Sequence, residues 1–231
     1  MKKEQFDLEG KHCTVYSGDE PEFFLLQPSD DHEAEFMDHE AELIAAGAGS
    51  KFILASFQVN DWDRDLSPWE APPVFGKEPF GDGAEDTLEY IIRDFMPEIR
   101  SRYDLPDDIP VIIGGYSLAA FFSLWSAYQT DTFSGVAASS PSVWFPGWID
   151  FAAGRNPMCG CIYLSLGKKE EKARNPVMAT VGDCIRKQHE ILNQSGVDCT
   201  LEWNDGNHFR EPDVRTAKGF IWCMNKISAR R

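Results

Sequence analysis

The sequence contains little basic charge. Its 22 Lys and Arg residues stand against 38 Asp and Glu residues, which gives a formal net charge of −16. Most of such a surface would repel a polyanion such as DNA or RNA, or an anionic membrane, so we expect no nucleic-acid partner and no membrane partner. The charge predicts solubility first of all, and a preference for neutral or cationic substrates is the alternative interpretation.

Long hydrophobic runs are also missing. No stretch of about 18 apolar residues occurs, so we expect no transmembrane helix. The basic start Met1–Lys3 is followed by Glu4, Asp7 and Glu9 rather than by an apolar segment, which is not the pattern of a secretory signal. These features together predict a cytoplasmic protein.

The sequence lacks the spacing of a metal site. Its six cysteines include one close pair, Cys159 and Cys161, which is not C-x-x-C and which no second Cys/His pair completes into a zinc set. In a chain of this length without a secretory signal, free thiols are expected rather than disulfides. We therefore expect no metal and no other cofactor.

Apolar material, in contrast, is sufficient for a sizeable core. Hydrophobic residues make up 42% of the 231, with 16 Phe and 7 Trp, and the length suits a single domain over residues 1–231. Two early strands followed by alternating strands and helices predict a mostly parallel sheet with helices on both faces. The predicted strands are 13–16, 22–26, 51–57, 109–114, 135–139, 161–166 and 199–204, and the predicted helices are 32–46, 84–103, 118–128, 176–193 and 212–227.

The strongest local pattern is the segment G-Y-S-L-A at residues 115–119. It fits G-x-S-x-G except that Ala119 replaces the last glycine. It also lies between an apolar strand (109–114) and a helix that is apolar nearly all round (118–128), which is the context that a nucleophile turn requires. The chain must turn sharply there, so small residues two positions on either side of Ser117 let strand and helix approach. A glycine-rich turn with a capping serine is the alternative.

Four segments of the sequence carry a family resemblance: G-Y-S-L-A at 115–119, T-F-S-G-V-A-A-S-S-P-S-V-W at 132–144, P-F-G-D-G at 79–83 and N-D-W-D-R-D-L-S-P-W at 60–69. They resemble the esterase D-like and enterochelin-esterase-like family of α/β-hydrolases. The resemblance covers most of the chain from about residue 50, and the first 30 residues match only loosely. It implies an α/β-hydrolase fold without a large cap domain, and Ser117 as the nucleophile.

A serine nucleophile needs a base, and His208 has the best position for one. It follows the last predicted strand, in a loop expected at the carboxyl edge of the sheet, where ligands bind in open α/β sheets. The resemblance also places the family's histidine in this loop. The other four histidines lie beside the first strand or on polar helix surfaces, positions typical of exposed residues: His12, His32, His39 and His189.

The acid that orients His208 should follow the strand at 161–166. The family pattern G-x-x-[DE] after that strand implies Glu170, starting from Gly167. Glu171 competes with it, and a solvated run of charges is the alternative for both.

The remaining site residues are less well defined. One oxyanion donor should be the N–H of Leu118, and the second should come from the loop after the 51–57 strand, for which we take Val59. The long loop at 58–82 is expected to rim the site. Its aromatic residues and those near 145 should either contact the substrate, above all Trp62 and Trp144, or cover core edges: Trp62, Trp69, Trp144, Phe145 and Trp148. Arg64 could bind a substrate carboxylate, although pairing with Asp61 or Asp65 is favoured.

Together these patterns predict a serine esterase that hydrolyses a small-molecule carboxylic ester through an acyl-enzyme. Ser117 would be the nucleophile, His208 the base and Glu170 the acid. An acyltransferase with the same site and a non-catalytic binding protein on a hydrolase scaffold remain alternatives. The sequence does not indicate the oligomeric state.

Overall fold

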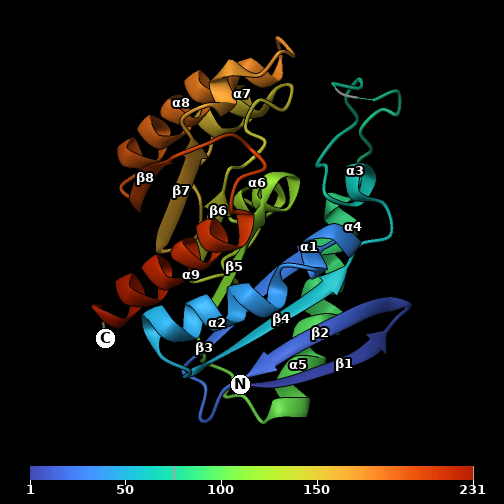
Figure 1. Cartoon of the computed structure of the whole chain (residues 1–231), viewed down its shortest axis with the longest axis vertical. Helices are drawn as coiled ribbons and strands as arrows, with labels where there is room; N and C mark the ends of the chain where they lie inside the picture. Colours follow the sequence, from blue (N-terminus) through green and yellow to red (C-terminus); the bar gives the residue numbers. More distant parts are fainter. Residues whose placement is uncertain (75, 231) are drawn as a thin grey trace.

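An eight-stranded sheet forms the centre of the computed structural model, which describes residues 1–74 and 76–230 (Figure 1). The strand order is β1-β2-β4-β3-β5-β6-β7-β8. The strands are β1 (Lys2–Leu8), β2 (Lys11–Ser17), β3 (Phe23–Ser29), β4 (Phe52–Gln58), β5 (Val111–Tyr116), β6 (Gly135–Ser139), β7 (Cys161–Gly167) and β8 (Asp198–Asn204). β1 pairs antiparallel with β2, and β2 with β4, whereas all later neighbours are parallel. The prediction of a mostly parallel sheet is confirmed.

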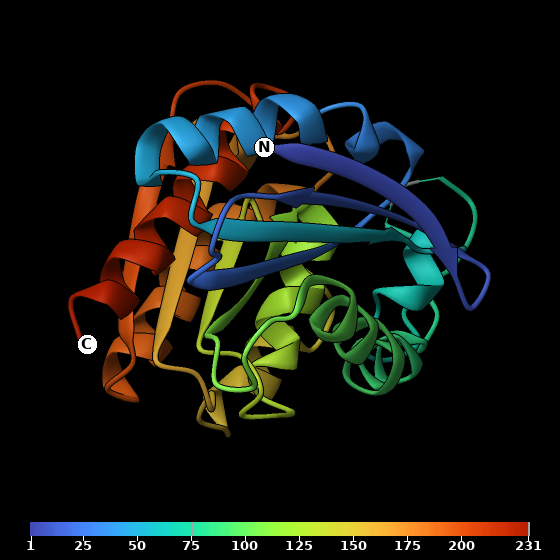
Figure 2. The same ribbon diagram turned by 90° about the horizontal axis from the view of Figure 1, so that it is seen from below.

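Helices cover both faces of this sheet (Figure 2). One face carries α2 and α9, which pack against each other, and the other face carries the helices between β4 and β8. The α-helices are α1 (Asp31–Ala34), α2 (Met37–Ala48), α3 (Trp62–Asp65), α4 (Ala84–Tyr90), α5 (Met96–Tyr103), α6 (Ser117–Ser126), α7 (Trp148–Ala153), α8 (Val181–Gln194) and α9 (Pro212–Ser228). The shorter turns are the π-helical η1 (Ile91–Phe95) and the 3₁₀-helical η2 (Glu170–Lys172) and η3 (Met178–Thr180). Within the described ranges, no helix combines the length and the hydropathy needed to cross a bilayer.

The helical run after β4 differs from the prediction in one detail. We expected a kink at Pro97 in a helix over 84–103. The structure instead places the irregularity before it, as the π-helical turn η1. Proline has no N–H to donate to the carbonyl four residues back, so the preceding turn loses a hydrogen bond and widens.

The carboxyl ends of the parallel strands all reach one edge of the sheet. β5, β6 and β7 are buried along their whole length, which fixes their register and hence the position of the loops that follow. Ser117 follows β5, Glu170 follows β7 and His208 follows β8. The fold therefore brings all three to the same edge.

Candidate active site

The turn between β5 and α6 holds Ser117 in a strained conformation. Its φ angle is 57°, in the left-handed region that residues with a side chain rarely adopt. Gly115 has a φ of 149°, and a Cβ there would lie 2.9 Å from the Cβ of Ala119. Close packing of strand and helix thus requires glycine at 115 and tolerates alanine at 119. Ser117 is half-buried between the buried Tyr116 and Leu118, so its hydroxyl faces the cavity beside it.

A chain of hydrogen bonds links Ser117, His208 and Glu170. His208 Nε2 lies 3.0 Å from Ser117 Oγ, and His208 Nδ1 lies 2.7 Å from Glu170 Oε2. With the proton on Nδ1, the ring donates to the carboxylate and accepts from the serine hydroxyl, which is the arrangement of a nucleophile, a base and an orienting acid. The structure brings together the three residues for which the sequence predicted these roles.

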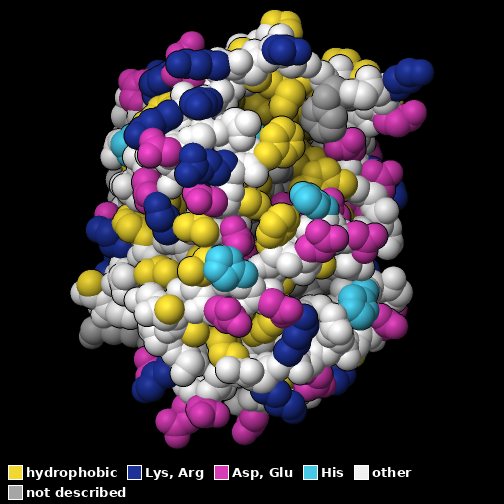
Figure 3. Space-filling model, viewed as in Figure 1, with side chains coloured by type: hydrophobic (Ala, Val, Ile, Leu, Met, Phe, Trp, Pro, Cys, Tyr) yellow, Lys and Arg dark blue, Asp and Glu magenta, His cyan; other side chains and the backbone are white. Residues whose placement is uncertain are grey.

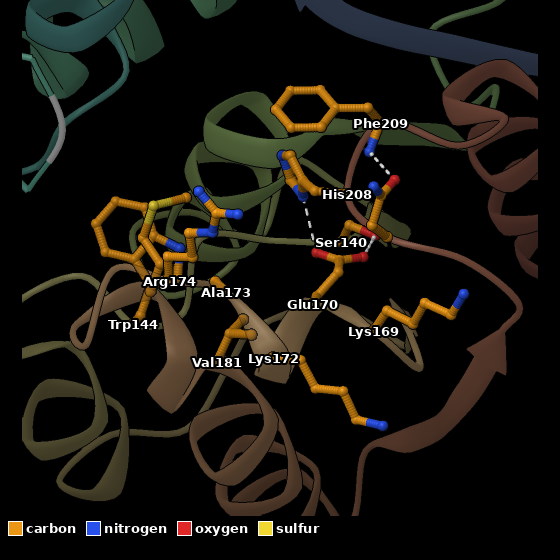
Figure 4. A pocket seen from close by; sticks show the side chains of 12 residues that line it. Ser140, Trp144, Lys169, Glu170, Lys172, Ala173, Arg174, Val181, His208 and Phe209 are labelled. Carbon is orange, nitrogen blue, oxygen red and sulfur yellow. Dashed lines mark hydrogen bonds and ion pairs between the residues drawn. The ribbon is translucent and has the colours of Figure 1, made fainter.

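The surroundings of Glu170 distinguish it from its neighbour. Glu170 is 7% exposed, and its Oε1 accepts from the Gly167 N–H at 2.7 Å. The same oxygen accepts from Ser140 Oγ at 2.8 Å (Figure 4). Glu171 points elsewhere and pairs with Arg186 at 2.8 Å. The geometry therefore favours Glu170 as the acid.

Arg215 is a buried cation that the sequence analysis missed. It is 1% exposed, and its Nη1 donates to Glu170 Oε1 at 3.1 Å and to Tyr116 Oη at 2.9 Å. Its Nη2 donates to the carbonyls of Asp205 and Asn207, both at 3.0 Å, in the loop that carries His208. One guanidinium thus fixes both Glu170 and the loop that carries His208.

Tyr116 adds a further tie to the same loop. Its hydroxyl donates to the carbonyl of His208 at 2.7 Å. Burial raises the pKa of Tyr116, and the charge of Glu170 raises it further, so the phenol stays a donor at neutral pH.

The sequence did contain a signal for the buried position of Arg215. Arg215 shares a helical face with Gly219, Cys223 and Ile227, and a lone cation on an apolar stripe needs a buried partner.

Two cavities meet at His208 and Phe209. The first has a volume of about 500 Å³ and is lined by Trp144 among others. The second has a volume of about 420 Å³, and Trp62 and Ser117 are among its lining residues. Phe209 is 84% exposed and lines both. Figure 3 shows hydrophobic side chains gathered in the upper central part of this face of the molecule. The structure therefore places both predicted substrate-contacting tryptophans at the site, one in each cavity.

The other aromatic residues of these loops belong to the core or its edge. Trp148 is fully buried and Phe145 is 2% exposed, and both rings pack against Phe121. Trp69 packs against Phe145 and donates to the carbonyl of Pro146. Cover of the core is thus the better interpretation for these three.

The two predicted oxyanion donors have different outcomes. The Leu118 N–H lies in the first turn of α6, where an α-helix offers no internal acceptor. The choice of Val59 is wrong, because its N–H already donates to the carbonyl of Ser29 at 3.0 Å. β3 separates β4 from β5, so the loop after β3 is the one that reaches Ser117. Asp30 and His32 of that loop line the cavity that contains Ser117.

Charged residues nearby do not form a metal centre. Arg64 pairs with Asp65 at 3.7 Å, as the favoured alternative predicted. In the part of the chain that the structure describes, no group of three or more His, Cys, Asp or Glu residues is arranged to hold a metal ion.

Comparison with known proteins identifies the fold. No protein-family profile and no curated protein sequence matches the chain. An IroE-like serine hydrolase from Shewanella oneidensis superposes with a TM-score of 0.76 over 96% of this chain and 79% of its own, at 14% identity. The siderophore hydrolase EstA from Aspergillus nidulans gives 0.70 over 98% and 94%, at 15% identity. The BES protein from Bacillus cereus gives 0.69 over 96% and 95%, at 16% identity.

The chain has the α/β-hydrolase fold. The strand order, the strained turn at Ser117 after β5 and the order Ser117, Glu170, His208 along the chain all agree with that conclusion. The fold without a large cap domain was predicted from the resemblance, and the described residues carry no second layer of structure over the site. Because identities of 14–16% show the fold alone, function has to be argued from the site.

Proposed function

We propose that the protein is a serine esterase that hydrolyses a carboxylic ester through an acyl-enzyme. The observation that carries this proposal is the continuous hydrogen-bond chain from Ser117 through His208 to the buried Glu170. Structures with the same fold are named as a serine hydrolase and as siderophore hydrolases, which supports ester hydrolysis as the reaction class.

The reaction follows from the geometry. Ser117 Oγ attacks the ester carbonyl carbon while His208 Nε2 removes its proton, and the oxyanion forms next to the Leu118 N–H. When the tetrahedral intermediate collapses, the C–O bond to the alcohol breaks and His208 returns the proton to the leaving oxygen. A water molecule then attacks the acyl-enzyme by the same route and releases the acid. Glu170 holds His208 through Nδ1 and stabilises the imidazolium.

A non-catalytic scaffold would not need this arrangement. A left-handed serine costs free energy, on the order of 1–3 kcal/mol, and such strain persists where a site requires it. The two cavities beside His208 give the acyl and alcohol parts of an ester separate places. Both observations favour an enzyme over a binding protein.

Hydrolysis of a panel of p-nitrophenyl and aryl esters tests the proposal. We expect wild-type protein to hydrolyse at least part of the panel, and Ser117→Ala to lower kcat by several orders of magnitude while its circular dichroism spectrum stays unchanged. Added alcohols serve as acceptors, so that an acyltransferase would reveal itself by new ester products. Retention of more than about a tenth of the activity by Ser117→Ala would contradict the proposal.

A further inference from the structure

Almost all described cations of this acidic protein have a carboxylate or an aromatic ring as a partner. All but four of the Lys and Arg residues in 1–74 and 76–230 have a carboxylate oxygen within 4.0 Å or lie over an aromatic ring. The four exceptions are Lys77, Lys169, Lys172 and Arg174. With 38 acidic residues against 22 basic ones, unpaired cations are unexpected and their location is informative.

Three of these four cations line one cavity. Lys169, Lys172 and Arg174 all border the 500 Å³ cavity that also contains Trp144 and His208. The only acidic residue among the lining side chains, Glu170, is already neutralised by Arg215 at 3.1 Å. The cavity beside the base is therefore positive although the protein as a whole carries a net charge of −16.

The three cations do not have the same orientation. Figure 4 shows the guanidinium of Arg174 on the side of the cavity that holds His208, whereas the ammonium groups of Lys169 and Lys172 extend away from its centre. A planar guanidinium binds a carboxylate through two parallel hydrogen bonds, and more remote lysines add positive potential. A single converging cation suits a singly charged carboxylate better than a dianionic group.

Apart from Ser140 and Asn207, the rest of the cavity wall is apolar. Trp144, Met178, Val181 and Phe209 form its walls, and a volume of about 500 Å³ lies within the range of small-molecule sites. The second cavity has the opposite character, since Asp30 and Glu33 line it. Burial raises the pKa of Glu33, and Asp30 and Glu40 raise it further, which marks that cavity as unfavourable for another negative charge.

From these observations we infer that Arg174 binds an ionised carboxylate of the substrate, at the end of an apolar chain or ring that packs along Trp144. The inference rests on the proposed esterase function and specifies its substrate class as esters with one free carboxylate. It also reverses the expectation from net charge alone, under which neutral or cationic substrates would be preferred.

Matched pairs of esters provide the test. One pair carries the carboxylate on the acyl side, namely mono-p-nitrophenyl adipate or suberate against p-nitrophenyl hexanoate or octanoate. The other carries it on the alcohol side, namely 4-acetoxyphenylpropionate against its methyl amide. We expect wild-type protein to prefer the charged member of at least one pair by kcat/KM.

Two variants test whether Arg174 causes the preference for charged esters. Arg174→Gln should lower the ratio of kcat/KM values, charged over neutral, by about 10- to 100-fold, mainly through KM, because a hydrogen-bonded charge pair is lost. Lys77→Gln removes the same charge from a cation that lies outside the cavity and is, within the described residues, unpaired like Arg174; it should leave both the ratio and the activity unchanged. This control separates local binding from a general change in surface charge.

The outcomes distinguish the two proposals. If the esters are hydrolysed but neither pair shows a preference for the charged member, or if Arg174→Gln lowers both members of a pair equally, the carboxylate site is overturned and the esterase stands. If Lys77→Gln lowers the ratio as much as Arg174→Gln does, long-range charge explains the preference and the site is again overturned. If wild-type protein hydrolyses no ester in either pair and Ser117 does not react with a serine-directed probe, the esterase proposal fails and the inference with it.

Discussion

Glu170 and Glu171 are adjacent in the chain, yet their surroundings differ completely. Glu170 lies under His208 and accepts hydrogen bonds from Gly167, Ser140 and Arg215. Glu171 lies in a surface ion pair with Arg186, a type of contact that contributes little to stability. One peptide bond thus separates a residue of the candidate site from a surface residue.

The pair allows a sharp prediction. Glu170→Gln keeps the size of the side chain but removes the charge that stabilises the imidazolium, so kcat should fall about 10³- to 10⁴-fold. Glu171→Gln should leave kcat within a few-fold of wild type. Steady-state hydrolysis of one reactive ester by both variants checks this. The reverse order would make Glu171 the acid, and normal activity in both variants would point to another carboxylate or to a Ser–His dyad.

The contacts of Arg215 could not be predicted from the sequence motifs. Its role depends on the loop at 205–207, and also on Tyr116 and Glu170, which lie 99 and 45 residues away in the sequence. No local pattern contains these partners. The polar position on the apolar face of α9 could still have indicated a buried partner, although not which one.

At the scale of elements, the predictions succeeded where one physical signal dominated. The apolar run of β5 followed by a small-residue turn predicted the β5–α6 unit within one or two residues. β1 was not predicted, because Lys2, Lys3, Glu4 and Asp7 give it the charged, half-exposed pattern of an edge strand. α7 was not predicted either, since short helices between Pro146, Gly147 and Gly154 look like loop in sequence.

The error at Val59 has a different origin. Local patterns do not specify strand order, and the sequence alone did not reveal that β3 lies between β4 and β5. The prediction therefore placed the second oxyanion donor in the loop after β4 instead of the loop after β3. Long-range sheet topology, rather than any local propensity, decides this point.

Glu40 on helix α2 is buried between the helix and the sheet. The side chain is 4% exposed, its Oε2 is 3.4 Å from Gln27 Nε2 of β3, and its Oε1 has no hydrogen-bond partner among the described residues. Burial, helped by the negative charge of Asp213 on α9 and opposed by the hydrogen bond from Gln27, raises the pKa of Glu40 to about 8. The folded protein therefore keeps a proton here that the unfolded chain loses near pH 4.5.

This proton predicts a dependence of stability on pH. Between about pH 4.5 and pH 8 the folded state binds one proton more than the unfolded state at this position, so its contribution to the free energy of unfolding falls as pH rises. Glu40→Gln should remove that loss and raise stability at pH 9 by roughly 1–3 kcal/mol, with little change at pH 5. Thermal unfolding at both pH values measures the effect.

Glu42→Gln on the exposed side of α2 is the matched control and should change neither value. An equal effect of Glu40→Gln at both pH values would show that the substitution acts through packing rather than through the proton.

At the scale of the whole molecule, the candidate site depends on the parallel sheet. Ser117 and His208 are 91 residues apart, and Glu170 and His208 are 38 apart, yet the carboxyl edge of the sheet joins all three. The chain order serine, acid, histidine was predictable because it follows the order of the strands. The charge of the site was not predictable, since net charge gives no information on where the few unpaired cations gather.

The central claim is that Ser117 is an activated nucleophile, and covalent labelling tests it most directly. A fluorophosphonate reacts with a serine whose proton is removed by a neighbouring base, so we predict one adduct per chain, located on Ser117 by peptide mass spectrometry, with parallel loss of ester hydrolysis. Ser117→Ala should take up no label and His208→Ala should take it up far more slowly. Labelling at another residue, or full ester hydrolysis by a protein in which Ser117 is fully labelled, would contradict the account.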